Sequence, residues 1–369
     1  MRVGFDAKRI FHNTTGLGNY SRDTVRILAS YFSENSYFLY NPKPGKVDRL
    51  NLNNNMKVCL PKSKVWQKLS SLWRQKAIVK DLVADKVTIY HGLTNELPIG
   101  IENTTIKTVV TIHDLIFVRY PELYSYIDGK IHFKKFKRAA QVADRVIAIS
   151  EQTKRDIVDF LGVSPNKIEV VYQGCHSAFL ENYSLSEKNE VAKKYTLPSK
   201  FLLNVGTIQE RKNLLTIVKA IKNTNHSLVV VGKETVYAEK VKKYIDENNM
   251  TDRVLFLKGV SMQELAIIYQ MASIFIYPSI FEGFGIPIVE ALYSKTPVIS
   301  SVGSCFSEAG GPNSIYIEPH DEVALQQAIF NIENDTVLQK EMKEKGWQYA
   351  QQFLDEQIAK NLINVYKKL

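Results

Sequence analysis

The sequence has few cysteines and no long apolar run. Its three cysteines, Cys59, Cys175 and Cys305, lie far apart without the paired spacing of a disulfide framework or a zinc site. No hydrophobic run reaches the length of a membrane span. An acid at Asp6 interrupts the N-terminal residues before the apolar core of a signal peptide could begin. We therefore expect a protein of the reducing cytosol.

Signatures of RNA binding are also missing, and so are Asp-x-Asp pairs at the ends of expected strands. The chain nevertheless carries 48 lysines and arginines against 38 acids, a formal net charge of +10. Such a charge favours an anionic partner, and nucleic acid, an acidic membrane surface and a phosphorylated substrate all qualify. Charge alone does not choose between them.

Residues 62–80 form a basic segment that contains no acid. Large apolar residues recur in it at helical spacing, namely Trp66, Leu69, Leu72 and Trp73. The pattern fits a helix lying on an anionic membrane surface, but a core-facing helix with a solvated basic face is the preferred interpretation. A second basic cluster, at residues 130–138, has the same two interpretations.

Short apolar runs alternate with helical patterns over nearly the whole chain, which is typical of parallel sheets built from βαβ units. In the first half, strands are predicted at residues 3–5, 38–40, 57–60, 88–91, 108–112 and 145–149. In the second half, they are predicted at residues 201–205, 227–231, 254–257, 274–277, 297–300 and 314–317. A chain of 369 residues exceeds the usual size of one hydrophobic core. We therefore expect an α/β protein of two doubly wound, Rossmann-like domains.

The boundary between these domains is expected near Gln173. Residues 1–172 would form an N-terminal domain, and residues 173–349 a C-terminal domain. The final helical stretch is too long to need only one neighbour, so its end, about residues 350–369, is expected to pack back on the first domain. Open parallel sheets bind ligands outside the carboxyl ends of their strands. Two facing domains would therefore share an interdomain cleft.

Residues 279–290 are the most informative segment, because two carboxylates flank a glycine-rich turn directly before a helix. The helix is expected to begin near Ile286, since the proline that follows suits a first helical turn. Glycines let a ligand approach the backbone closely, and N–H groups at a helix N-terminus favour a phosphate. Glu282 and Glu290 would repel a phosphate, but each can accept hydrogen bonds from hydroxyls beside a diphosphate. The segment therefore predicts a nucleotide-sugar site.

Two adjacent cations, Arg211 and Lys212, follow a predicted strand and precede a helix expected from about Leu214. Such a pair has no evident structural role in a strand-to-helix loop, whereas binding of a diphosphate needs fixed positive charge. The alternative is a solvated pair of cations. Lys233 and Val260, which follow the next two predicted strands, are further candidates for the same cleft. Val260 would contact the base of the nucleotide through its backbone.

The first half offers a glycine loop and a histidine. Residues 13–21 form a polar loop with Gly16 and Gly18, expected to lead into a helix over residues 22–28. The loop suits a phosphate or a sugar, or it is a plain turn, and it lacks the third glycine of a dinucleotide fingerprint. His113 ends a predicted strand, so its ring is expected at the edge of the cleft, although a lone histidine is usually structural.

In their order along the chain, these motifs resemble family 4 of the retaining glycosyltransferases, which has the GT-B fold. The sharpest match is Glu282 and Glu290, with seven residues between them and the Gly-Phe-Gly-hydrophobic-Pro core intact. One departure is Thr207, where many members have arginine. The resemblance covers essentially the whole chain, and its further matches are Val205-Gly206 with Arg211-Lys212-Asn213, Gly16-Leu17-Gly18, Thr111 to Asp114 and Ala143 to Ser150.

The resemblance implies a division of labour in the second domain. Arg211 and Lys212 would hold the donor diphosphate and stabilise the leaving group, in place of a metal ion. Glu282 would contact the transferred sugar, and Glu290 would bind the ribose hydroxyls.

It also implies supporting contacts in both domains. The backbone N–H groups of Phe284 and Gly285 would help to hold the sugar or the phosphate. His113 would hydrogen-bond the donor sugar at the reacting face. Gly16 and Gly18 would lie beside the diphosphate and the acceptor.

The activity implied is metal-independent transfer of a hexose from a nucleotide-sugar to a glycan or lipid-linked acceptor, without a separate cofactor. It would serve cell-surface polysaccharide synthesis at the cytoplasmic face of a membrane. GDP-mannose is the favoured donor, because the phosphate loop resembles that of mannosyltransferases, and UDP-sugars are the alternatives. Two other functions compete with transfer. They are a nucleotide-sugar epimerase of the same plan, which needs no acceptor, and a basic nucleic-acid-binding protein.

Overall fold

The computed structural model describes residues 1–369 and divides the chain into two compact units. Unit 1 comprises Met1–Gln173 and Asp355–Leu369, and unit 2 comprises Gly174–Leu354. The division expected from the sequence ended the first domain at residue 172, and it began the returning helix at about residue 350. Each unit has its own apolar core, one around Val110 and Ala148 and the other around Val230 and Ile276.

Unit 1 contains a seven-stranded sheet in the order β3-β2-β1-β4-β5-β6-β7. All neighbouring strands are parallel, and Gly4 of β1 pairs with Phe38 of β2 and Tyr90 of β4. The short β7 was not among the predicted strands. The strands are β1 (Arg2–Asp6), β2 (Ser36–Tyr40), β3 (Met56–Cys59), β4 (Ile89–Gly92), β5 (Lys107–Ile112), β6 (Arg145–Ala148) and β7 (Ile168–Val170).

Unit 2 contains a six-stranded parallel sheet in the order β10-β9-β8-β11-β12-β13. Its strands are β8 (Leu202–Val205), β9 (Leu228–Val231), β10 (Val254–Leu257), β11 (Ile274–Tyr277), β12 (Val298–Ser301) and β13 (Ile315–Ile317). Both sheets therefore have the doubly wound, Rossmann-like order, and the prediction of the fold is confirmed. The strand order reverses between β1 and β4 in unit 1 and between β8 and β11 in unit 2, which is where such sheets bind ligands.

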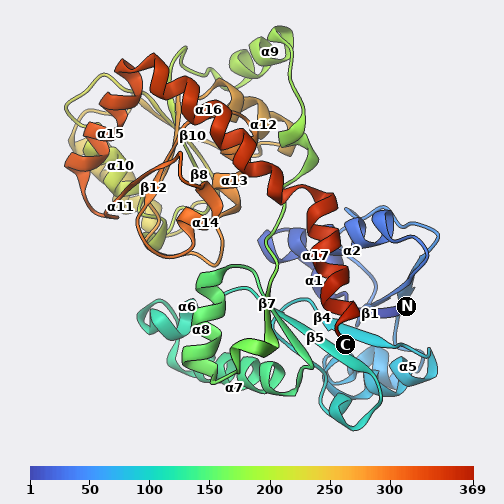
Figure 1. Ribbon diagram of the computed structural model, residues 1–369. Coiled ribbons are helices and arrows are strands. Elements are labelled where there is room, and N and C mark those ends of the chain that lie inside the picture. The colour runs from blue at the N-terminus through green and yellow to red at the C-terminus, as the bar shows by residue number, and fades with distance from the viewer. The chain divides into compact units, whose positions relative to one another are not determined.

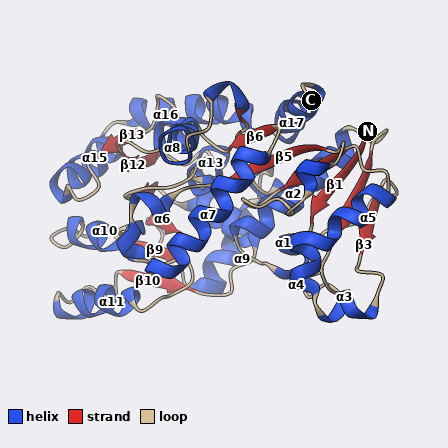
Figure 2. Cartoon of the chain, turned by 90° about the horizontal axis from the view of Figure 1, so that it is seen from below, coloured by secondary structure: helices blue, strands red, loops and turns tan.

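Helices pack around the strands of both sheets (Figure 2). In unit 1 they are α1 (Lys8–His12), α2 (Gly16–Tyr31), α3 (Lys64–Lys68), α4 (Ser70–Leu72), α5 (Ile78–Ala84), α6 (Ile116–Arg119), α7 (Tyr126–Val142), α8 (Glu151–Leu161) and α17 (Asp355–Lys367). In unit 2 they are α9 (Leu185–Tyr195), α10 (Leu214–Ala220), α11 (Tyr237–Glu247), α12 (Met262–Met271), α13 (Ile286–Tyr293), α14 (Phe306–Gly310), α15 (Glu322–Asn334) and α16 (Thr336–Ala350). None of them is both long and apolar enough to cross a membrane.

The last helix of the chain, α17, belongs to unit 1 and packs against α2, as the red and blue helices of Figure 1 show. The hydroxyl of Tyr366 lies 2.7 Å from Nδ1 of His91 on β4, and both side chains are buried. Asp355 pairs with Arg26 of α2 at 2.7 Å. The predicted continuous helical stretch is therefore two helices, because the chain leaves unit 2 between α16 and α17.

The basic segment at residues 62–80 is not one helix but two short helices, α3 and α4, followed by a π-helical turn, Trp73–Ala77, and the start of α5. Trp73 is buried, and its indole N–H donates to Asp81 at 2.7 Å. The apolar side chains before it stay outside the core, since Val65 is 61% exposed and Leu72 is 54% exposed. Neither of the two predicted interpretations describes the whole segment, because its second half packs into the core and its first half does not.

Candidate active site

The loops after β8 and β11 meet where the strand order of unit 2 reverses. Ile280 N–H donates to the carbonyl of Arg211 at 2.8 Å, and the Ser279 hydroxyl oxygen lies 3.1 Å from the same carbonyl oxygen. The Asn213 side-chain amide donates to the carbonyl of Pro278 at 3.1 Å. These hydrogen bonds fix two segments, about seventy residues apart, as one surface.

The backbone of the first of these loops has little freedom. Residues 210–212 form a 3₁₀ turn that ends at Asn213, whose φ of 58° is left-handed and which directly precedes α10. A Cβ on Gly232, after β9, would lie only 1.8 Å from the carbonyl oxygen of Gly206. Glycine is therefore required where the loops after β8 and β9 touch.

Glu282 brings the two predicted cations together. Its Oε1 lies 2.7 Å from a guanidinium nitrogen of Arg211 and 2.5 Å from Nζ of Lys212. The same oxygen accepts hydrogen bonds from Ser279 at 2.7 Å and Tyr277 at 3.1 Å. Lys212 also contacts the Tyr277 hydroxyl and lies over its ring, 4.6 Å from the centroid.

This cluster is buried, and burial lowers the pKa of Lys212 although Glu282 opposes the shift. Burial would raise the pKa of the Glu282 carboxyl, but Lys212 and Arg211 outweigh it and lower that pKa to about 2. Glu282 is therefore ionised at neutral pH. Two cations and one carboxylate leave the three side chains with one net positive charge, which suits an anionic ligand.

The turn after Glu282 leads into α13, which begins at Ile286 as predicted. Gly285 directly precedes the helix with a φ of 105°, a conformation that side chains disfavour. The sulfur of Cys305 lies 2.9 Å from the carbonyl oxygen of Phe284 and 3.2 Å from that of Glu282, and its single S–H donates to one of them. The Phe284 ring packs against the Phe353 ring, so the turn is anchored on both sides.

Glu290, on α13, has a different environment from Glu282. It is buried and accepts a hydrogen bond at 3.1 Å from the hydroxyl of Tyr269, a neutral partner. Burial raises the pKa of Glu290 to about 7. A carboxylate in such a place gains from additional hydroxyl donors, which is the role that the sequence predicts for it.

Lys233 and Val260 line one pocket of about 490 Å³ at the carboxyl ends of β9 and β10. Lys233 is exposed and Val260 is half-buried. The pocket also includes Glu234, to which the sequence assigned no role. The structure thus places both predicted residues on one concave surface of unit 2.

In unit 1, the predicted glycine loop is the first turn of α2. The helix begins at Gly16 and not at residue 22. A Cβ on Gly18 would lie 2.2 Å from the carbonyl oxygen of Asn13, whereas one on Gly16 would touch nothing. The buried Arg22 donates to the carbonyls of Ile10 and Asn13, both at 2.8 Å, and so fixes the approach to the helix. Tertiary hydrogen bonds thus override the weak helix propensity of the glycines.

His113 lies directly after β5, as predicted, and is buried. Its Nε2 lies 2.8 Å from the carbonyl oxygen of Leu93, so this nitrogen carries the proton of the neutral ring. Burial lowers the pKa of His113 to about 4. The ring of Tyr20, on α2, packs edge-on against it with centroids 4.5 Å apart. Unit 1 thus joins the histidine to the helix that carries Gly16 and Gly18.

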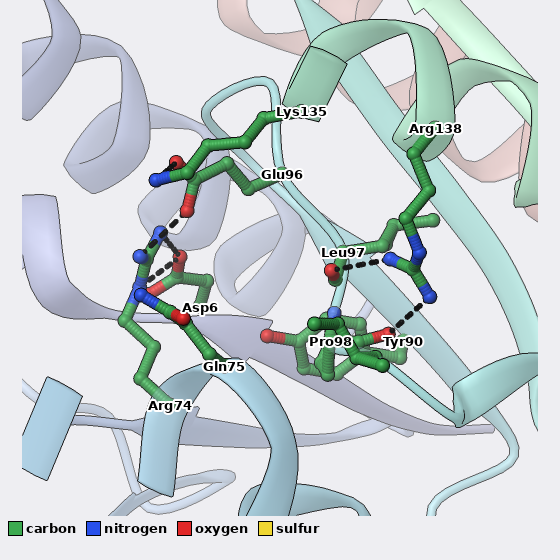
Figure 3. Close-up of a pocket in the computed structure, with 10 residues that line it drawn as sticks. Asp6, Arg74, Gln75, Tyr90, Glu96, Leu97, Pro98, Lys135 and Arg138 are labelled. Carbon is green, nitrogen blue, oxygen red and sulfur yellow. Dashed lines mark hydrogen bonds and ion pairs between the residues drawn. The ribbon is translucent and has the colours of Figure 1, made fainter. Parts of the chain in front are cut away.

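A charged pocket at the ends of β1 and β4 was not predicted. Arg74 pairs with Asp6 at 2.5 Å and with Glu96 at 2.7 Å, and Lys135 reaches the other Glu96 oxygen at 3.1 Å (Figure 3). Arg138, drawn at the other side of the pocket, donates to the carbonyl of Leu97. The only feature of the sequence that pointed to this cluster was Asp6, an acid at the end of the first strand.

Sequence reasoning also missed the neutral partners of the two glutamates. Tyr277 and Ser279 hydrogen-bond Glu282, Tyr269 hydrogen-bonds Glu290, and the Ser304 hydroxyl donates to the Glu282 carbonyl at 3.0 Å. Tyr277 ends β11 and Ser279 follows in the loop, so their position at a strand end was the available signal. Nothing in the sequence pattern singled out Tyr269 or Ser304.

Two family models match the chain. Residues 39–178 match the model described as Glycosyltransferase Family 4. Residues 186–349 match the model described as Glycosyl transferases group 1.

Among curated proteins, the O-antigen chain mannosyltransferase RfbU of Salmonella typhimurium is 33% identical over 227 residues, which is 61% of this chain and 60% of that protein. The O-antigen chain mannosyltransferase B of Escherichia coli is 24% identical, and the match spans the whole of both chains.

Solved structures share the fold at low identity. Sucrose-phosphate synthase from Thermosynechococcus elongatus has a TM-score of 0.79 at 19% identity, over 100% of this chain and 98% of its own. Anabaena Alr3699/HepE in complex with UDP and glucose has a TM-score of 0.75 at 16% identity, over 100% of each chain. The similarity extends over both units.

Proposed function

The chain belongs to family 4 of the glycosyltransferases, and from this we propose that it transfers a hexose from a nucleotide-sugar to a glycan or lipid-linked acceptor, with retention of configuration. The observation that carries the proposal is the contact of Arg211, Lys212 and Glu282 at the point where the strand order of unit 2 reverses. Parallel sheets of this order bind ligands there.

The donor diphosphate is proposed to bind Arg211 and Lys212. When the anomeric C–O bond breaks, negative charge moves onto the diphosphate, so fixed cations stabilise the transition state more than the ground state. Hydrogen bonds and burial hold the cations in place before the donor binds, so little reorganisation is needed. Glu282, which already accepts from Ser279 and Tyr277, is proposed to contact the hydroxyls of the transferred sugar.

Front-face attack is the proposed route to retention, with the leaving phosphate oxygen accepting the proton of the acceptor hydroxyl. A covalent route requires a nucleophilic carboxylate. Glu282 is a poor nucleophile, because two cations neutralise it and lower its pKa to about 2. The role of Glu290 is proposed to be the binding of the ribose hydroxyls, since its present partner is the neutral Tyr269.

GDP-mannose is the proposed donor, and O-antigen-like polysaccharide synthesis the proposed setting. The support is that two similar proteins are named O-antigen chain mannosyltransferases. We expect GDP to raise the melting temperature of the protein more than UDP does, in a thermal-shift panel of nucleotides. The reverse ranking would exclude the preference for a guanine donor.

The acceptor is proposed to be lipid-linked, and residues 62–72 are proposed to touch an anionic membrane surface. Val65 is 61% exposed, Leu69 is 46% exposed and Leu72 is 54% exposed, among lysines and without an acid. Such a surface binds anionic headgroups and the acyl boundary together. In a flotation assay, we expect binding to vesicles with phosphatidylglycerol, and loss of it in the L69S/L72S double variant. Binding unchanged by these substitutions would refute this surface.

Acceptor dependence tests the activity itself. Hexose should leave the nucleotide-sugar only when a glycan or lipid-linked glycan acceptor is added, and the product should keep the anomeric configuration of the donor. Conversion of the donor without any acceptor would support the epimerase alternative instead.

A further inference from the structure

The pocket at the ends of β9 and β10 adjoins the proposed phosphate site within unit 2. The loops after β8 and β9 are joined, because Gly206 N–H donates to the Val231 carbonyl and Ile208 N–H donates to the Lys233 carbonyl, both at 2.9 Å. Glu234 forms the next bridge, with Ile208. A nucleoside attached to a diphosphate at Arg211 and Lys212 is therefore within reach of this pocket.

Glu234 is the one acid that lines the pocket. Its Oε2 accepts a hydrogen bond from Lys242 of α11 at 2.8 Å. Its Oε1 is shielded from solvent and lies 2.9 Å from Nζ of Lys258, which balances the charge. The Lys258 side chain is 71% exposed, so it can move aside without disturbing the core. Once Lys258 has moved, Oε1 can accept a hydrogen bond from a donor group that enters the pocket.

Nucleobases differ in what they offer to a carboxylate. Guanine presents two adjacent donors, N1–H and the 2-amino group, which match the two oxygens of a carboxylate. Uracil presents a single N3–H between two carbonyl oxygens, which a carboxylate repels. Adenine presents an amino group beside an unprotonated ring nitrogen. A carboxylate in a base pocket therefore selects guanine.

We propose that Glu234 reads the base of the donor, accepting hydrogen bonds from N1–H and the 2-amino group of guanine after Lys258 has moved aside. The inference rests on the proposed function, because it requires a nucleotide-sugar in unit 2. It adds what the phosphate and sugar contacts cannot supply, a side chain that distinguishes GDP from UDP. Lys242 holds the carboxylate in place from the side of α11.

The test measures the affinities of GDP and UDP for the full chain by calorimetry, in the wild type and in Glu234→Gln. The wild type should bind GDP more tightly than UDP. The variant should bind GDP about 10- to 100-fold more weakly, as loss of charge-assisted hydrogen bonds implies, and UDP with unchanged or slightly higher affinity. The ratio of the two affinities is the readout that a merely structural role of Glu234 would not change.

Glu247→Gln is the matched control, because it breaks an exposed ion pair with Lys243 on the same helix, α11, and lies outside the pocket. It should keep the preference for GDP. If Glu234→Gln does not fold, Glu234→Asp replaces it, because the shorter side chain keeps the charge but withdraws it from the pocket. The same fall in the ratio of GDP affinity to UDP affinity is expected.

Two results would overturn the inference. A wild type that prefers UDP would also exclude GDP-mannose as the donor but would leave hexose transfer standing. A wild type that prefers GDP, with a ratio unchanged in Glu234→Gln, would overturn the inference alone. A wild type that binds neither nucleotide would instead remove the proposed function, and with it the premise of the inference.

Discussion

The two sheets follow the same winding order, but the side chains at their carboxyl ends are charged in different ways. In unit 2, Arg211 and Lys212 share one carboxylate, that of Glu282. In unit 1, two cations, Arg74 and Lys135, pair with two carboxylates, those of Asp6 and Glu96. Unit 2 thus keeps positive charge in excess at the carboxyl ends of its strands, while unit 1 neutralises the cations at the same edge of its sheet.

The histidine of unit 1 extends this contrast. Burial lowers the pKa of His113 to about 4, so the ring is neutral at the pH at which the Glu282 carboxyl is ionised. A neutral ring can hydrogen-bond a sugar hydroxyl without attracting a phosphate. Two copies of one architecture have thus been given different chemistry by their loops, which agrees with the general separation of fold from function.

Glu282→Gln should produce the largest change, because it leaves Arg211 and Lys212 buried without a carboxylate. We expect a loss of about 3–5 kcal/mol in the free energy of unfolding at pH 7, measured by urea titration, together with impaired sugar transfer. The wild-type pKa lies below that of an unfolded carboxyl, so this contribution is present above about pH 4.5 and is lost as the pH falls toward 2. The difference in the free energy of unfolding between wild type and variant should therefore become smaller at acidic pH.

The matched control is Glu322→Gln, which breaks an exposed pair with Lys219 in the same unit. It should change stability by less than about 1 kcal/mol. Equal losses in the two variants would mean that the Glu282 cluster is an ordinary surface ion pair.

Lys212→Ala should lower kcat/KM by about 100-fold or more, because the developing charge on the diphosphate loses a fixed cation. Steady-state kinetics with saturating acceptor would measure it. Lys219→Ala, on the neighbouring helix α10, is the comparison and should transfer sugar normally. Near-wild-type transfer by Lys212→Ala would remove the proposed difference between the units.

Glu290→Gln should change the pH dependence of stability by about 1–3 kcal/mol. The folded pKa of about 7 lies above the ordinary 4.5, so the folded wild type binds more protons between these values and loses stability as the pH rises through them. The variant lacks this loss. Its melting temperature should therefore rise relative to that of the wild type between pH 5 and pH 8.

The same substitution removes a carboxylate that is proposed to bind ribose, so GDP should bind more weakly to Glu290→Gln. Parallel melting curves for the two proteins across this pH range, with undiminished GDP binding, would contradict both expectations.

Tyr366→Phe should have the smallest effect, a loss of about 1 kcal/mol in the stability of unit 1, because one buried hydrogen bond to His91 disappears. Thermal unfolding would measure the change. GDP binding, which depends on unit 2, should be unaltered. A parallel loss of GDP affinity would show that the two units do not act separately.

The sequence predicted where most strands lie because their apolar runs are compact and well separated. It missed β7, where Glu169 interrupts a run of three residues. It also predicted a loop where α2 begins, since two glycines disfavour a helix and the hydrogen bonds of Arg22 that stabilise this turn cannot be seen from spacing.

The candidate site was predicted residue by residue, but not as a cluster. Arg211, Lys212 and Glu282 were assigned to different parts of a substrate, and their mutual contact depends on loops about seventy residues apart. Pairing of this kind is tertiary, as is the difference in pKa between Glu282 and Glu290, which reflects the presence of cations beside one and not the other.

The return of α17 to unit 1 has a consequence for biosynthesis. During translation, residues 1–173 leave the ribosome before unit 2, yet the helix that covers His91 and pairs with Arg26 emerges only after unit 2. Unit 2 can therefore complete its fold while unit 1 still lacks a helix, although domains usually mature from the N-terminus onward. A nascent chain truncated before Asp355 would leave the α17-binding surface of unit 1 open to chaperones or to a neighbouring chain.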